Sequence, residues 1–363
     1  MLAASEEALL RRYGAVPVAQ RLRSGGSSLR CVAALGDGSQ RPQRCGREKG
    51  AMAAQLAGDE PVLDRSFRGH KGPVNCLAFS PTARQLASGG ADASVMVWNF
   101  KPQLRAFKLE GHREPVHSVA FSPAGDLIAS GSADRTVRLW RPTVKGESSV
   151  IKAHGGAVRS VDFSADGGSL VAASDDKTLK VFSVPSKRFQ CTLSGHSNWV
   201  RAARFSPRDE RVIVSGGDDK TVKLWDTAQK NAVQTFYEHT GAVCAVAFHP
   251  DGNSIASAGA DKSVKLWDVR TGRLLQHYTA HAACVNSVAF DPAGDYLITA
   301  SDDATVKLLD LREGHVYFTL YGHESAATDA AFSAGVLHAM FGMANCHGSA
   351  MFCMVLRRCC VFG

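Results

Sequence analysis

The sequence predicts an all-β protein, a seven-bladed β-propeller, and three observations support this prediction. Histidines recur at intervals of 42 residues, with a single interval of 43. An aspartate follows each of the first six histidines by 22 or 23 residues, and an aromatic or apolar residue follows the aspartate by six. A period of this length is typical of propeller blades. The repeated histidines are His70, His112, His154, His196, His239, His281 and His323.

The second repeat shows how one unit is expected to fold. Three of its runs are rich in β-branched and aromatic residues and are predicted as strands: Val116–Phe121, Leu127–Gly131 and Thr136–Trp140. The segments Ser-Pro-Ala-Gly-Asp and Ser-Ala-Asp-Arg between these runs contain the residues that turns favour. A fourth strand is expected before the next histidine, as in Phe189–Leu193. Four short antiparallel strands make one propeller blade.

Three regions differ in composition. Residues 61–333 carry the repeats and are predicted to form the propeller. Residues 1–60 are expected to be a disordered amino-terminal extension, because they are rich in Gly, Ala, Ser and Arg without a hydrophobic period. Within them, residues 1–51 look like an extension from an upstream start and lack the pattern of a signal peptide. Residues 334–363 are a divergent tail replacing the rest of blade seven, so this blade is expected to be degenerate or incomplete, with open sheet edges.

The spacing of these landmarks resembles the WD40 repeat family across residues 61–333. The resemblance implies a hydrogen-bonded set of His, a strand hydroxyl, the turn Asp and Trp in each blade. All four residues are expected only in the second repeat, because Phe182 and Leu309 replace the Trp in repeats three and six. Repeats one, four and five have Cys76, Ala202 and Ala245 at the expected hydroxyl position, which predicts weaker networks there. The implied network residues are His112, Ser118, Asp134 and Trp140; His154, Ser160 and Asp176; and His281, Ser287 and Asp303.

Several segments resemble a narrower group, the proteome-of-centriole WD40 proteins. This resemblance implies a non-enzymatic interaction scaffold of centrioles and basal bodies that supports centriole assembly or stability and cilium formation. It also implies a place in the cytoplasm and cytoskeleton, with centriolar or microtubule-associated proteins as partners. The coiled-coil segment of that group is not recognisable here, so self-association is expected to be reduced. The segments are 96–112, 145–154, 199–207, 264–278 and 295–314.

A partner-binding rim is predicted from the residues that vary between repeats. Positions three and five after each histidine, and the residue before each turn aspartate, are expected at one rim of the propeller. Most of these positions hold small residues, but blades three and four carry charged and aromatic ones. An exposed Trp beside Arg is typical of interface hot spots, whereas the alternative is a Trp that lies flat on its neighbouring blade. The predicted rim residues are Trp199, Arg201, Arg159, Asp175 and Asp218, followed by His117, Asn286 and Asp302.

Charge and motifs argue against other classes of function. The formal net charge is +8, but residues 61–332 carry only +3, which gives no general case for binding nucleic acid. The histidines fall in separate blades, so no metal site is expected. No nucleophile motif, phosphate loop or paired-acid site is recognisable, so neither catalysis nor a cofactor is expected. The four cysteines within the repeats are expected to be buried thiols: Cys76, Cys191, Cys244 and Cys284.

Two weaker alternatives remain open. The tetrad Trp267-Asp268-Val269-Arg270 matches a WDxR pattern by which some propellers bind cullin-type ubiquitin ligases as substrate receptors. This alternative predicts that Arg270 is exposed on the face opposite the rim. The stretch 330–356 carries no Lys, Arg or Glu and is long enough to span a bilayer, but its histidines, asparagine and glycines disfavour insertion. The composition of this stretch therefore disfavours a membrane anchor.

Overall fold

The computed structural model describes residues 33–34, 62–101, 104–144, 146–321, 323, 325–333, 338–343 and 350–355. Residue contacts divide the chain into the units Met1–Arg30 and Cys31–Gly363. All described residues belong to the second unit, and its regular elements in these ranges are strands. The prediction of an all-β propeller is confirmed. The predicted disorder of residues 1–60 lies outside the described residues except for β1 (Ala33–Ala34), which pairs with the outer strand of blade six.

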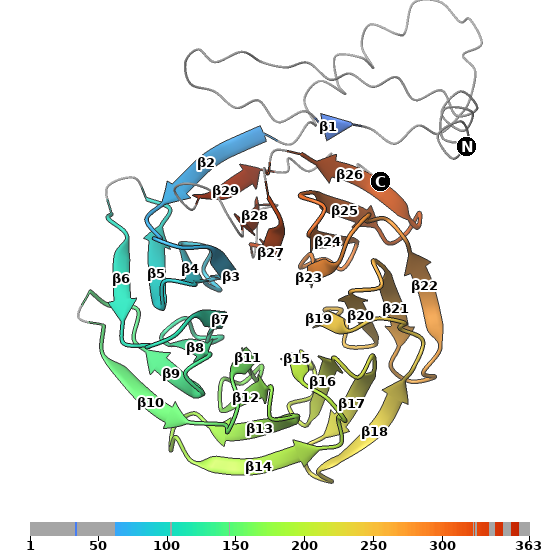
Figure 1. The fold of residues 1–363 in the computed structure, drawn as a ribbon, viewed down its shortest axis with the longest axis horizontal. Helices are drawn as coiled ribbons and strands as arrows, with labels where there is room; N and C mark the ends of the chain where they lie inside the picture. The colour runs from blue at the N-terminus through green and yellow to red at the C-terminus, as the bar shows by residue number, and fades with distance from the viewer. Residues whose placement is uncertain are drawn as a thin grey trace, which may run out of the picture. The chain divides into compact units, whose positions relative to one another are not determined.

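Six blades, each an antiparallel sheet whose strands follow chain order, surround a common centre (Figure 1). The first strand of each blade lies innermost and the fourth lies at the outside. Blades one to three are β3 (Val74–Phe79), β4 (Gln85–Gly90), β5 (Ser94–Asn99), β6 (Phe107–Glu110); β7 (Val116–Phe121), β8 (Ile128–Ser132), β9 (Thr136–Trp140), β10 (Ser148–Lys152); β11 (Val158–Phe163), β12 (Ser169–Ser174), β13 (Thr178–Ser183), β14 (Phe189–Ser194). Blades four to six are β15 (Val200–Phe205), β16 (Val212–Gly217), β17 (Val222–Asp226), β18 (Asn231–Phe236); β19 (Val243–Phe248), β20 (Ser254–Gly259), β21 (Val264–Asp268), β22 (Leu274–Tyr278); β23 (Val285–Phe290), β24 (Tyr296–Ser301), β25 (Val306–Asp310), β26 (His315–Leu320).

The hydrophobic core lies between neighbouring blades. The second strand of each blade is almost wholly buried, and its side chains are mainly small or aliphatic, as in the sequence Ile-Ala-Ser-Gly-Ser of β8. Trp140 at the end of β9 is 1% exposed and packs in one cluster with Val97 and Leu109 of blade one. Since each large apolar side chain contributes about 1.5–3 kcal/mol when fully buried, these contacts hold adjacent blades together.

A further four-stranded sheet joins the two ends of the repeat region. It contains β27 (Ala327–Phe332), β28 (His338–Met343), β29 (Ala350–Val355) and β2 (Val62–Arg68), with β29 paired to β2. The divergent tail therefore supplies two strands to this sheet. The rest of the tail lies outside the described residues, and a seventh WD40 blade stays a prediction.

Hydrogen bonds connect the innermost strand of this sheet with blade one. The Thr328 hydroxyl donates to the Val74 carbonyl at 2.7 Å, and the Leu77 N–H donates to Asp329 Oδ2 at 2.7 Å. Asp329 also accepts the Ser287 hydroxyl of blade six. Because Asp329 is buried, the pKa of its carboxyl is raised. One carboxyl group thus links three neighbouring sheets.

Candidate protein-interaction site

Each blade is fixed by a buried polar network, and its hydroxyl differs from the predicted one. In blade two, His112 Nδ1 lies 2.8 Å from Asp134 Oδ2, and His112 Nε2 lies 2.7 Å from Ser130 Oγ. The Trp140 Nε1–H also donates to Ser130 Oγ, at 2.8 Å. Burial lowers the pKa of His112, so the neutral ring donates from Nδ1 to the aspartate and accepts the serine hydroxyl at Nε2.

The assignments of Ser118, Ser160 and Ser287 to these networks are therefore wrong. These serines lie on the innermost strands, where their hydroxyls bind other groups instead. Ser118 Oγ accepts the Val161 N–H at 3.1 Å, and Ser160 Oγ accepts the Ala203 N–H at 3.2 Å, so both connect one blade to the next. The true position is on β8, ten residues before the Trp, where the hydroxyl of Ser130 accepts the indole N–H. In the pairing of β8 with β9, Ile128 lies opposite Trp140, and Ser130 lies two residues further along the same face of the sheet.

The expected weakness of blades one, four and five is wrong for the same reason. Their networks are complete, because the hydroxyl lies on the second strand rather than at Cys76, Ala202 or Ala245. Blade three lacks this hydroxyl, and His154 Nε2 lies 3.2 Å from the Ala172 carbonyl. Blade six keeps the hydroxyl but has Leu309 in place of the Trp. The network hydroxyls are Ser88, Ser130, Ser215, Ser257 and Thr299.

A ring of side chains from the innermost strands surrounds the centre of the propeller. The second residue of each of these strands forms a β-bulge, which redirects its side chain. Sequence reasoning identified four members of this ring and missed three, although all lie five residues after a repeat histidine. The ring residues are Asn75, His117, Arg159, Arg201, Cys244, Asn286 and Thr328.

Two arginine–aspartate pairs form the polar part of the predicted rim. Arg159 donates from Nε and Nη2 to Asp175, with the Nη2 contact at 2.8 Å. Arg201 donates in the same way to Asp218, at 2.7 and 3.0 Å. The hydrogen bonds to Asp218 raise the pKa of Arg201. Bidentate pairs of this kind hold the guanidinium planes in one orientation.

Trp199 lies over both arginines. Its ring centroid is 5.6 Å from Arg201 Cζ and 5.9 Å from Arg159 Cζ, which are cation–π distances. The indole nevertheless stays 41% exposed. The Trp199 carbonyl accepts the Asp218 N–H at 2.8 Å, which fixes the residue before β15 to the turn that carries the aspartate. The structure therefore brings the five main rim residues of the prediction into one cluster.

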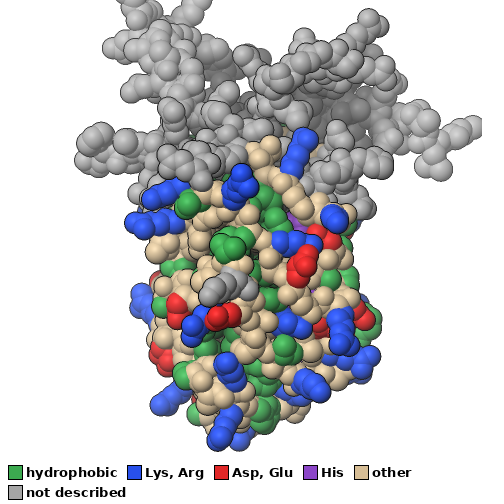
Figure 2. Space-filling model, turned by 90° about the vertical axis from the view of Figure 1, so that its left-hand side faces the viewer, with side chains coloured by type: hydrophobic (Ala, Val, Ile, Leu, Met, Phe, Trp, Pro, Cys, Tyr) green, Lys and Arg blue, Asp and Glu red, His purple; other side chains and the backbone are tan. Residues whose placement is uncertain are grey.

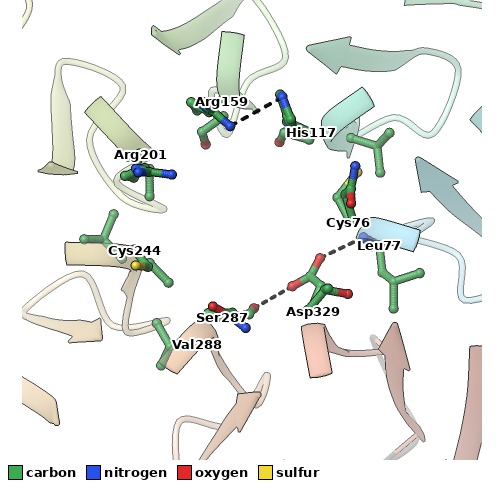
Figure 3. A pocket seen from close by; sticks show the side chains of 18 of the residues that line it. Cys76, Leu77, His117, Arg159, Arg201, Cys244, Ser287, Val288 and Asp329 are labelled. Carbon is green, nitrogen blue, oxygen red and sulfur yellow. Dashed lines mark hydrogen bonds between the residues drawn. The ribbon is translucent and has the colours of Figure 1, made fainter. Parts of the chain in front are cut away.

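The remaining predicted rim residues divide into two groups. His117 Nε2 lies 3.5 Å from Arg159 Nη1, so it borders the cluster (Figure 3). Burial, with the positive charge of Arg159, lowers the pKa of His117 to about 4. Asn286 donates to Asp302 at 2.7 Å and to the Ala327 carbonyl at 3.0 Å, so these two residues lie in blade six, apart from the cluster.

The ring encloses the mouth of a small central cavity of about 100 Å³. Figure 3 shows the side chains of Arg159, Arg201, His117 and Cys244 arranged around it. Arg204 also lines the cavity and donates to Ser160 Oγ at 3.3 Å. Within the described part of the chain, no three side chains of His, Cys, Asp or Glu form a group that could hold a metal ion.

Charge on the outer surface is mixed. On the side shown in Figure 2, Lys and Arg side chains are spread among acidic and hydrophobic ones. This distribution agrees with the small net charge of the repeat region. Among the described residues, no helix is long and apolar enough to cross a membrane.

The WDxR tetrad spans the end of β21 and the turn that follows it. Trp267 is buried in the blade network, and Asp268 Oδ1 accepts the Arg270 N–H at 2.9 Å. Asp226 and Asp310 accept the equivalent N–H groups in blades four and six. Arg270 itself is exposed, at the end of β21 away from Asp261. The Trp-Asp pair thus has a structural explanation in every blade where it occurs.

Comparison with known families agrees with this geometry. The model of the WD domain, G-beta repeat, matches six segments: 62–99, 103–141, 146–183, 187–226, 230–268 and 272–310. The chain belongs to the WD40 repeat family. Each matched WD40 segment contains the outermost strand of one sheet and the three inner strands of the next, so successive repeats overlap successive blades.

Curated relatives resemble shorter parts of the chain. It is 60% identical over 57 residues to POC1 centriolar protein homolog B of Xenopus laevis, which is 16% of this chain and 12% of that protein. It is 56% identical over 50 residues to POC1 centriolar protein homolog A of Danio rerio, which is 14% of this chain and 12% of that protein. The matched region of the chain therefore spans only about an eighth of the length of these relatives.

Proposed function

We propose that this WD40 protein is a non-enzymatic protein-interaction scaffold of centrioles and basal bodies, where it supports centriole assembly or stability and cilium formation. The similarity to proteins named as centriolar supports the location. The cluster of Trp199, Arg159 and Arg201 supports the binding role, because its components are those of interface hot spots. Partners are proteins of the centriole or of microtubules, rather than nucleic acid or membranes.

Preorganisation of the rim is the observation that carries the proposal. Both guanidinium groups are already held by Asp175 and Asp218, and the indole lies against them. A partner that covers this surface therefore immobilises few rotatable bonds, which reduces the entropy lost on binding. The exposed part of Trp199 supplies apolar contact area at the centre of a polar border.

We also propose that the sheet β2-β29-β28-β27 acts as a seventh blade. The pairing of β2 with β29 supports this, as do the hydrogen bonds from Thr328 and to Asp329. A closed ring removes the exposed strand edges that invite aggregation. A rigid ring in turn keeps the rim residues of blades three and four in a fixed arrangement.

Localisation in ciliated cells tests the proposed function. We expect the tagged full chain to overlap a centriole marker, and a Trp199→Ala/Arg201→Glu variant to be diffuse at equal solubility. Phe189→Ala is the matched control, because Phe189 is 55% exposed but pairs with Phe182 at the other end of blade three. A wild-type chain that is soluble and diffuse would contradict the centriolar role. Equal localisation of all three proteins would contradict the assignment of the rim.

The ubiquitin-ligase receptor is not favoured, because Asp268 is explained by the turn that it stabilises. Arg270 is exposed, as that alternative requires, so a direct comparison is possible. We expect no cullin adaptor to co-purify with the wild-type chain above the level found with Arg270→Ala. Recovery of an adaptor that depends on Arg270 would support the alternative instead.

A further inference from the structure

Two thiols from neighbouring blades meet beside the rim. Cys244 is the ring residue of blade five, and Cys284 immediately precedes β23 of blade six. Their Sγ atoms are 3.7 Å apart, and both residues are half-buried rather than enclosed. The prediction that all four repeat cysteines are buried is correct for Cys76 and Cys191 and wrong for this pair.

We propose that Cys244 and Cys284 are a redox modification site, at which hydrogen peroxide forms a reversible disulfide between blades five and six. A disulfide has an S–S distance of about 2.05 Å, so the sulfur atoms must approach by roughly 1.7 Å. The inference does not depend on the proposed centriolar role.

The surroundings distinguish the roles of the two thiols. A hydrogen bond with Cys284 lowers the pKa of Cys244, and the positive charge of Arg201 acts in the same direction. The same hydrogen bond and burial raise the pKa of Cys284. Thiolates are the nucleophiles in thiol chemistry, so Cys244 is the residue that reacts first. Cys76 has its pKa raised by complete burial and is a poor competitor.

The reaction consumes one peroxide molecule. The Cys244 thiolate attacks one peroxide oxygen, the O–O bond breaks, and the departing hydroxide takes a proton to become water. The resulting sulfenic acid has a new S–O bond. Cys284 then attacks the sulfenic sulfur, the S–S bond forms, and the S–O bond breaks to release a second water that includes the Cys284 proton. Two thiols lose two electrons, and the peroxide gains them.

Peptide mapping of the full chain tests this directly. Trypsin places the two cysteines in the peptides 231–262 and 274–307, each of which contains one cysteine. The folded protein is treated with hydrogen peroxide, remaining thiols are alkylated, and the digest is analysed by mass spectrometry before and after reduction. Cys191→Ser is the matched control, since it removes a buried thiol that makes no hydrogen bond to another thiol in the described part of the chain.

We expect a reducible cross-link between these two peptides in the wild-type chain and in Cys191→Ser. The link should be absent from Cys244→Ser. In Cys284→Ser, a sulfenic acid at Cys244 should accumulate and be trapped by dimedone. Unfolding in urea before oxidation should remove most of the specific cross-link, because ten cysteines then compete. Absence of the cross-link from the folded wild-type chain, or pairing of the same yield after unfolding, would overturn the proposal.

Discussion

Ser130 provides the sharpest test of how the blades are stabilised. Its hydroxyl is fully buried and serves both His112 Nε2 and the Trp140 indole N–H. Ser130→Ala leaves both groups without a partner, and each buried group left unpaired costs about 1–3 kcal/mol. The expected loss in the free energy of unfolding is therefore roughly 2–6 kcal/mol. Ser118→Ala removes the acceptor of one backbone N–H, that of Val161, and should cost about half as much.

Urea unfolding followed by circular dichroism measures both losses. A second comparison isolates the indole contact: in a Trp140→Phe background only His112 Nε2 loses its partner, so Ser130→Ala should cost about half its value in the wild-type chain. The reasoning fails if Ser118→Ala destabilises the protein as much as Ser130→Ala. It also fails if Trp140→Phe leaves the cost of Ser130→Ala unchanged.

Two further predictions concern pH and ring closure. His117 has a pKa of about 4 in the folded protein against an ordinary value of 6.5, so the unfolded chain binds the proton first and stability should fall as the pH decreases from 6.5 to 4. Urea titrations across this range should show a shallower decline for His117→Asn, and an identical decline would contradict the assignment. Asp329→Ala leaves the Leu77 N–H and the Ser287 hydroxyl without their acceptor, and should cost roughly 2–6 kcal/mol in the same unfolding assay. A loss below that of an Asp295→Ala control, which removes a half-buried carboxylate paired with Arg312, would show that Asp329 does not join the sheets.

The sequence predicted the repeat, the propeller and the main rim cluster, because these depend on residues that recur at fixed positions in each repeat. Residues at a fixed distance from each histidine occupy equivalent places in each blade, so Trp199 and Arg201 could be assigned to one rim. The network hydroxyl was missed because the second repeat has three serines in strands, Ser118, Ser130 and Ser132. Only the folded structure, in which the Trp140 indole N–H donates to Ser130 across the β8–β9 pair, shows which of them belongs to the network.

Contacts between blades were beyond sequence reasoning. Cys244 and Cys284 are 40 residues apart and meet only because β19 and β23 pack side by side. The same holds for Asp329 and Leu77, which are 252 residues apart. The pairing of β28 and β29 was not expected either, because the tail lacks the turn aspartate and tryptophan of the other repeats.

Site-specific photo-crosslinking in ciliated cells tests the central claim, that the rim of blades three and four is the partner-binding face. Benzoylphenylalanine in place of Ala157 would lie beside Asp175, whose N–H the Ala157 carbonyl accepts at 3.0 Å, and would leave Trp199 and Arg201 intact. The same photoreactive residue in place of Phe189 is the control at the other end of blade three. Our account predicts that centriolar proteins are cross-linked from position 157 and not from position 189. Equal recovery from both positions, or recovery from position 189 alone, would contradict it.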